Sequence, residues 1–223
     1  MNRRRFLTGT AITGLTALAG CLGSAGDTGP TDGGGDGGGE MHPALGNVDV
    51  QPVLGSADQE ALIVAYEDPS CSTCRRFEQN TLPELKAKHI DTGNVAFAFR
   101  VYPIIYPWGK PAVQALEATY ARDEDAFWSL KDHYYADQPS FSEANVLEKT
   151  EQFLAAETDL DAAAVAQDAR DKAYDDAVQL DLDSGKAAGA SATPTFYLFL
   201  DGELQTSVQG AQDVRVFENA LQL

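Results

Sequence analysis

The chain has 223 residues, of which 43% are hydrophobic and 22% charged, which suits one globular domain of moderate size with appendages. Its 34 Asp and Glu residues outnumber 16 Lys and Arg residues, so the formal net charge is -18. Nucleic acid is not expected as a partner, because phosphate binding requires a basic face that this composition does not offer.

Residues 1–20 predict an export signal, since three arginines precede an apolar run that is too short and weak to span a bilayer comfortably. The stretch RRRFL at 3–7 resembles a twin-arginine motif. The stretch LAGC at 18–21 resembles a lipoprotein box, in which Cys21 is lipidated and becomes the mature first residue. An ordinary cleaved signal with an incidental Cys21 is the alternative. We therefore expect an extracytoplasmic lipoprotein anchored in the cell membrane.

The segment 21–45 is rich in Gly and Asp and has almost nothing to bury, which predicts a flexible tether outside the fold. The acidic residues of the rest of the chain are dispersed, and lysine is scarce. This pattern resembles the surface composition of proteins from high-salt organisms; an ordinary acidic, solvated surface is the alternative.

Strand and helix patterns alternate in the first part of the folded region. A short edge strand is expected within 47–55, a buried central strand at 61–66 and a second strand at 94–102. Between them, residues 71–90 predict a helix that Pro83 kinks or divides. The apolar loop 102–110 is interpreted mainly as core packing, with a substrate groove as the alternative.

The pattern of residues 111–186 is almost entirely helical. Two β-runs within 193–210 follow, joined at Asp201-Gly202, which is a strong hairpin signal, and an amphipathic helix closes the chain at 213–223. The order β-α-β, helical block, β-β-α predicts a mixed sheet with helices on both faces and a helical insertion.

Cys71 and Cys74 form a C-x-x-C pair at the junction of the central strand and the helix, where three interpretations compete. A structural zinc site needs four ligands, and the three histidines of the chain are not paired in sequence, so no metal is expected. A structural disulfide across two intervening residues would remove little unfolded-state entropy. A redox couple is therefore favoured, without a cofactor.

Position predicts different roles for the two thiols. Cys71 would lie in the first helical turn, where free N–H groups and the helix dipole stabilise a thiolate. Cys74 would lie deeper and resolve a mixed disulfide. Arg75 is a possible modulator of the thiolate, but a solvated or acid-paired arginine is the favoured alternative.

These residues resemble the DsbA-like thioredoxin-fold oxidoreductases. The stretch from PVLG at 52–55 to C-x-x-C places Asp68 three residues before Cys71, AFWSLKDHYY resembles the Phe-Trp helix of the inserted domain, and TPTF at 193–196 resembles a family strand. The resemblance covers about residues 47–223. It implies a thioredoxin fold, a mixed β-sheet flanked by helices, with an all-helical insertion at 110–187 between fold halves at 46–109 and 188–223.

The resemblance also implies that Thr193 and Pro194 form a cis-proline loop facing the cysteines, where Thr193 pairs with a substrate backbone. The dipeptide Ser72-Thr73 departs from the family's strong-oxidant and reductant types, which leaves the direction of electron flow open.

The favoured function is disulfide donation to exported proteins by a monomer that a membrane redox partner serves. A reductant of extracytoplasmic thiols, such as apocytochrome or metal-site cysteines, is one alternative. A non-catalytic binding or chaperone lipoprotein with a structural disulfide is the other.

Overall fold

A computed structural model describes residues 41–223 of the chain. The predicted signal, the lipidation site Cys21 and most of the predicted tether lie outside the described residues. They remain predictions.

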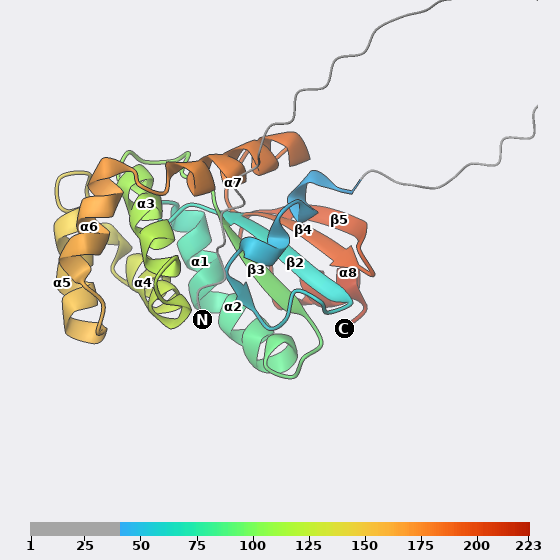
Figure 1. Cartoon of the computed structure of the whole chain (residues 1–223). Helices are drawn as coiled ribbons and strands as arrows, with labels where there is room; N and C mark the ends of the chain where they lie inside the picture. The colour runs from blue at the N-terminus through green and yellow to red at the C-terminus, as the bar shows by residue number, and fades with distance from the viewer. Residues whose placement is uncertain (1–40) are drawn as a thin grey trace, which may run out of the picture. The chain divides into compact units, whose positions relative to one another are not determined.

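The described residues contain a five-stranded mixed sheet in the order β1-β3-β2-β4-β5 (Figure 1). Strands β2 and β3 are parallel, whereas β1 against β3, β2 against β4, and β4 against β5 are antiparallel. The mixed sheet predicted from the element order is therefore confirmed. The strands are β1 (Val53–Leu54), β2 (Ala61–Glu67), β3 (Ala96–Val101), β4 (Thr195–Leu200) and β5 (Glu203–Gln209).

The central strand β2 is buried along its whole length because both faces of the sheet are covered. This burial explains its continuous apolar sequence. At the other end of the chain, Asp201 and Gly202 join β4 to β5, and both have positive φ angles of 53° and 77°. That combination is the one a two-residue hairpin turn requires.

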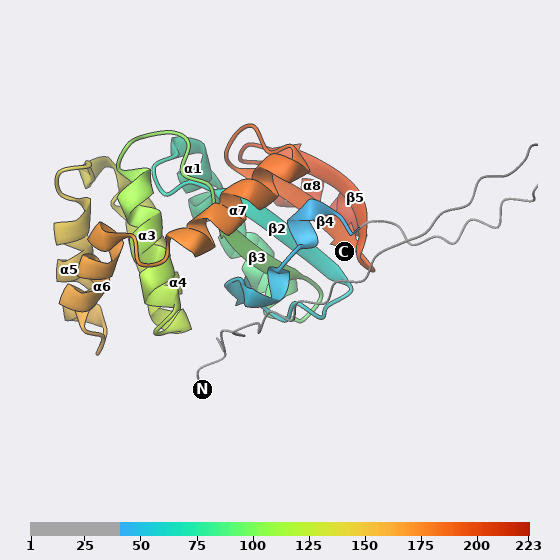
Figure 2. The same ribbon diagram turned by 45° about the horizontal axis from the view of Figure 1, so that its top comes forward.

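Helices cover both faces of the sheet, as Figures 1 and 2 show. Helix α1 (Ser72–Asn80) and helix α8 (Val214–Leu221) pack on one face through Phe77 and Phe217, whose ring centroids are 5.8 Å apart. Helix α7 (Asp175–Ala188) and the short 3-10 helix η1 (Pro43–Leu45) cover the other face, where Tyr66 of β2 and Tyr197 of β4 belong to the buried cluster.

The helical insertion lies at one end of the sheet (Figure 1). Its core is continuous with that of the α1 face and contains Leu116, Phe127 and Tyr134. The insertion's last helix, α7, runs from the insertion across the sheet (Figure 2). The helices before it are α3 (Gly109–Tyr120), α4 (Glu124–Ala136), the 3-10 helix η4 (Gln138–Ser140), α5 (Val146–Glu157) and α6 (Ala162–Asp171).

Two local details bear on the sequence-based expectation: the end of the predicted tether differs from it, and the division of the predicted helix near Pro83 confirms it. The last residues of the predicted tether belong to the fold, because Ala44 is fully buried and the His42 ring lies 5.1 Å from that of Tyr197. The predicted helix over 71–90 is divided at Thr81, two residues before Pro83, because the proline takes the N-terminal end of a new helix, where a missing N–H costs nothing. The pieces after α1 are α2 (Leu82–Leu85) and the π-helix η3 (Lys86–Ile90), and a further 3-10 helix, η2 (Val48–Val50), precedes β1.

Candidate active site

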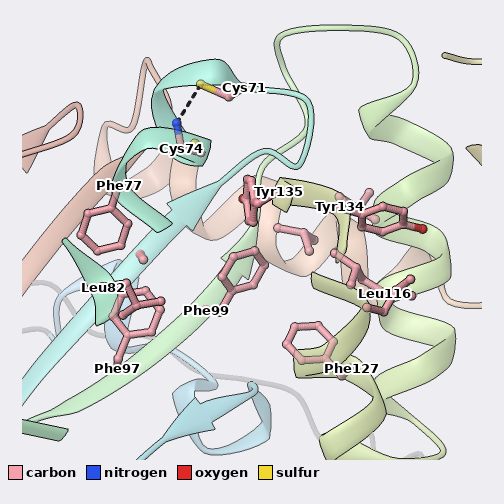
Figure 3. Close-up of a cluster of buried hydrophobic side chains, with 14 of the residues drawn as sticks. Cys71, Cys74, Phe77, Leu82, Phe97, Phe99, Leu116, Phe127, Tyr134 and Tyr135 are labelled. Atoms are coloured by element: carbon pink, nitrogen blue, oxygen red, sulfur yellow. Dashed lines mark hydrogen bonds between the residues drawn. The ribbon is translucent and has the colours of Figure 1, made fainter. Parts of the chain in front are cut away.

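Cys71 is the residue that caps the N-terminus of α1. Its backbone is extended, with φ -82° and ψ 120°, and its Sγ accepts a hydrogen bond from the backbone N–H of Cys74 at 3.4 Å (Figure 3). The thiol therefore occupies the position that a Ser or Asp side chain takes in an ordinary helix cap. An anion is stabilised there by the free N–H groups of the first turn.

The two cysteines differ in accessibility. Both are free thiols; 4% of Cys71 is exposed, whereas none of Cys74 is. Only Cys71 therefore offers a sulfur to a partner, and Cys74 lies behind it in the core that includes Phe77 (Figure 3).

The surroundings of the two cysteines also shift their pKa values in opposite directions. Hydrogen bonding from the Cys74 side chain, with support from Thr193 and from the backbone N–H groups of Thr73 and Cys74, lowers the pKa of Cys71 to about 6, although burial opposes this shift. Burial raises the pKa of Cys74 well above its ordinary value. At neutral pH, Cys71 is thus mainly a thiolate and Cys74 a thiol. This is the arrangement that a nucleophile and a resolving group require.

The loop before β4 brings Thr193 and Pro194 to the cysteines. The Thr193–Pro194 peptide bond is cis, and Cys71 Sγ lies 3.2 Å from the Thr193 carbonyl oxygen, to which it donates when it is protonated. Residues 122 positions apart in sequence therefore meet at the reacting sulfur.

Asp68 connects residues 68–74, which contain both cysteines and are called the redox turn, to the loop that follows β3. Its Oδ1 accepts from the backbone N–H and the hydroxyl of Ser70 at 2.8 and 2.6 Å, and its Oδ2 accepts from the Ile105 N–H at 2.7 Å. Burial raises the pKa of Asp68. The structure thus gives Asp68 a role in holding the turn.

The other predicted modulators lie in different places. Ser72 is exposed beside Cys71, and Thr73 acts on Cys71 through its backbone N–H. The Arg75 guanidinium instead donates to the Ala136 carbonyl at 3.3 Å, at the end of α4. Arg75 therefore contacts the helical insertion.

A buried polar cluster beneath Cys74 was missed by the sequence analysis. Glu67, at the end of β2, is fully buried, and its Oε2 accepts from the Tyr135 hydroxyl at 3.1 Å. The Lys131 ammonium lies 2.5 Å from Glu78 Oε2, and both side chains are almost fully buried. The charged residue that ends the apolar run ALIVAYE was the one available signal for Glu67.

The loop after β3 divides its side chains between core and surface. Tyr102 and Trp108 are buried, but Ile104, Ile105 and Tyr106 are 44%, 44% and 57% exposed. The prediction that this loop mainly packs in the core is therefore only partly right.

An open cavity of about 440 Å³ is lined in part by Ser70 and Ser72, the sequence neighbours of Cys71. Its lining comes from the redox turn, the loop after β3 and the α4–α5 connection. Aromatic and polar side chains share this lining, a mixture typical of ligand-binding clefts.

Neither a metal cluster nor a membrane-spanning helix is present in the part of the chain that the structure describes. Residues 41–223 contain no group of three or more His, Cys, Asp or Glu side chains arranged to hold a metal ion. The same residues include no helix with the length and apolarity to cross a membrane.

Known proteins are similar to this chain in sequence and in fold. The sequence profile of the thioredoxin family matches residues 47–218. The probable disulfide bond formation protein D of Bacillus anthracis is 28% identical over 150 residues, which cover 66% of this chain and 69% of that protein. Disulfide bond formation protein D of Bacillus subtilis is 28% identical over 149 residues, which cover 66% of this chain and 67% of the relative.

The crystal structure of oxidised BdbD from Bacillus subtilis has the same fold, with a TM-score of 0.69. The two chains are 22% identical, and the match covers 79% of this chain and 95% of the BdbD chain. The chain belongs to the thioredoxin family. Within that family it is a DsbA-like protein thiol–disulfide oxidoreductase.

Proposed function

We propose that this oxidoreductase works as an oxidant, which donates the Cys71–Cys74 disulfide to exported proteins outside the cytoplasm. The observation that carries the proposal is the capping position of Cys71, whose pKa is lowered to about 6. A thiolate stabilised in this way favours the reduced form of the pair, which makes the oxidised form a stronger electron acceptor. The names of the Bacillus relatives, which are disulfide bond formation proteins, point in the same direction.

The exchange proceeds in two steps. A substrate thiolate attacks Cys71 Sγ of the disulfide, the bond between the two cysteines breaks, and Cys74 leaves with the electron pair and takes up a proton. A second substrate thiolate then attacks the substrate sulfur of the mixed disulfide, and Cys71 leaves as a thiolate. The substrate gains one disulfide, and the enzyme gains two electrons.

The proposal also covers how the enzyme meets its substrate, its redox partner and the membrane. The backbone of Thr193 would pair with an extended substrate segment in strand fashion. The enzyme would work as a monomer, and a membrane redox partner would reoxidise the pair. Lipidation of Cys21 would keep the domain at the cell surface, and the acidic composition would suit a high-salt environment.

The equilibrium reduction potential of the cysteine pair tests the direction of exchange. Redox titration against glutathione in high salt is expected to give about -120 to -180 mV, the range of oxidants. A value near about -270 mV would make the protein a reductant. A potential below about -300 mV together with an inert Cys71 would assign the pair a structural role and contradict the proposed function.

A further inference from the structure

The helical insertion reaches the redox turn through one buried amide side chain. Gln138 is the first residue of η4, directly after α4, and only 9% of it is exposed. Its Nε2 donates to the carbonyl oxygen of Pro69 at 2.7 Å and to that of Cys71 at 3.0 Å. One side chain thus binds the backbone on both sides of Ser70.

We propose that Gln138 is a positioning residue for Cys71, through which the insertion holds the redox turn in its capping conformation. This inference rests on the proposed exchange function for its catalytic consequence. Its structural part concerns only the orientation of the Cys71 sulfur.

The argument starts from the carbonyl group of Cys71. The direction of this carbonyl is set by the ψ angle of Cys71, 120°, and the same backbone conformation allows Sγ to receive the Cys74 N–H. The carbonyl also accepts the Arg75 N–H at 3.0 Å, the first hydrogen bond of α1. Gln138 supplies a second donor to this oxygen and so restrains the peptide plane that follows the reacting residue.

The Pro69 carbonyl gives the second point of attachment. A buried carbonyl without a donor costs free energy comparable to a lost hydrogen bond. Gln138 satisfies this group, and the loop that leads from β2 to Cys71 is therefore tied to the insertion. Asp68 ties the same loop to the segment after β3 through Ile105.

Gln138 is itself held in place by the fold. The Phe141 N–H donates to the backbone carbonyl oxygen of Gln138 at 3.2 Å, and the centroid of the Phe141 ring lies 5.3 Å from that of Trp108. Gln138 also lines the open cavity beside Cys71. A substrate joined to Cys71 would therefore lie next to the side chain that positions the sulfur.

The test compares Gln138→Met with Gln114→Met. Gln114 is a matched control, because it is a buried glutamine of the same insertion whose Nε2 donates to Asp175 Oδ1 at 2.7 Å, within the insertion. The readouts are the pH midpoint of Cys71 alkylation in the reduced protein, the rate of disulfide transfer to a reduced dithiol peptide, and stability in urea.

Gln138→Met is expected to raise the alkylation midpoint by about 0.5–1 pH unit, the equivalent of about one hydrogen bond, and to slow transfer severalfold. Gln114→Met should lose stability with no shift of the midpoint. Gln138→His, which keeps a ring N–H donor, should shift the midpoint less than Gln138→Met.

Equal midpoints and transfer rates in wild type and Gln138→Met would overturn the inference, even if stability fell. Should Gln138→Met fail to fold, Gln138→Ala takes its place, because it also lacks the N–H donor to the Pro69 and Cys71 carbonyls. An unshifted midpoint in Gln138→Ala would overturn the inference equally. The wild-type protein tests the proposed function separately. If the wild type transfers no disulfide but Gln138→Met still raises the alkylation midpoint of Cys71, the exchange proposal fails and the positioning role stands.

Discussion

The carboxyl group of Glu67 acts on the thiol of Cys74 inside the protein core. Neither residue has any exposed surface, and the negative charge of Glu67 adds to burial in raising the pKa of Cys74. Glu67 itself has a raised pKa, because it is buried and lies near Glu78. The thiol of Cys74 and the carboxyl group of Glu67 thus lie in the same low-dielectric surroundings, where ionisation of either group is disfavoured.

Replacement of Glu67 by Gln is expected to lower the pKa of Cys74. The amide carbonyl still accepts from Tyr135, so the change removes the charge and largely preserves the packing. Carbon-13 chemical shifts of labelled cysteine, followed against pH, measure the effect. Glu84→Gln on the exposed side of α2 serves as control, and an unchanged Cys74 titration in Glu67→Gln would refute the electrostatic coupling.

The reduced protein should react with iodoacetamide along a titration curve with its midpoint at about 6, the lowered pKa of Cys71. Reactivity is lost as pH falls below this value, because the thiolate is protonated. In Cys74→Ser, the hydrogen bond from the Cys74 thiol is replaced by one from a hydroxyl, so the midpoint is expected to stay below the ordinary cysteine value. A wild-type midpoint at the ordinary value would contradict the capping argument.

Stability of the reduced form should depend on pH for the same reason. The Cys71 pKa is lower in the folded than in the unfolded chain, so the thiolate contributes stability that is full above the unfolded value and is lost as pH falls through about 6. Thermal unfolding of the reduced protein, compared with the oxidised protein, should show a relative gain in melting temperature between pH 6 and the ordinary thiol range, about 8.5. A constant difference across this range would argue against a thiolate in the folded protein.

Gly109→Ala is expected to destabilise the protein by about 1–3 kcal/mol. A Cβ atom at Gly109 would lie 2.5 Å from Asp68 Oδ1 and 2.9 Å from Ser70 Oγ, so the hydrogen bonds that hold the redox turn would have to shift. Urea unfolding measures the loss. Gly46→Ala is the control, because its nearest contact is 3.3 Å; equal effects of the two substitutions would refute the crowding argument.

Asp181→Ala should cost about 3–5 kcal/mol, since it leaves the buried Arg100 without its carboxylate partner. Asp181 Oδ1 lies 2.8 Å from Arg100 Nη1, and Oδ2 accepts from the Val101 N–H at 2.9 Å. Asp183→Ala, at an exposed position of the same helix, is the control in chemical denaturation. The alkylation midpoint of Cys71 should be the same in both variants, and a loss below 1 kcal/mol in Asp181→Ala would show that the pair is dispensable.

Sequence patterns were sufficient for the architecture where local signals are strong. The apolar run of β2, the Asp201-Gly202 turn and the helical block each predict an element that the structure contains. The C-x-x-C spacing also predicted which thiol is accessible, because a position at a helix start fixes depth as well as electrostatics.

Contacts between distant segments were beyond the reach of local patterns. Lys131 and Gln138 occur in ordinary helical sequence, and only the packing of the insertion against α1 and the redox turn brings them to Glu78 and Cys71. The short edge strand expected within 47–55 is present as β1, but its two residues are defined by pairing with β3, which a local pattern does not specify.

The start of the described chain and the cysteines belong to opposite faces of the sheet. Ala44 packs in the cluster on the α7 face, whereas Cys71 and Cys74 belong to the cluster on the α1 face. A solid support or electrode coupled at residue 41 would therefore lie on the face opposite to that of the cysteines. The N-terminal side of the described domain is thus the preferred point for immobilising this oxidoreductase on a surface.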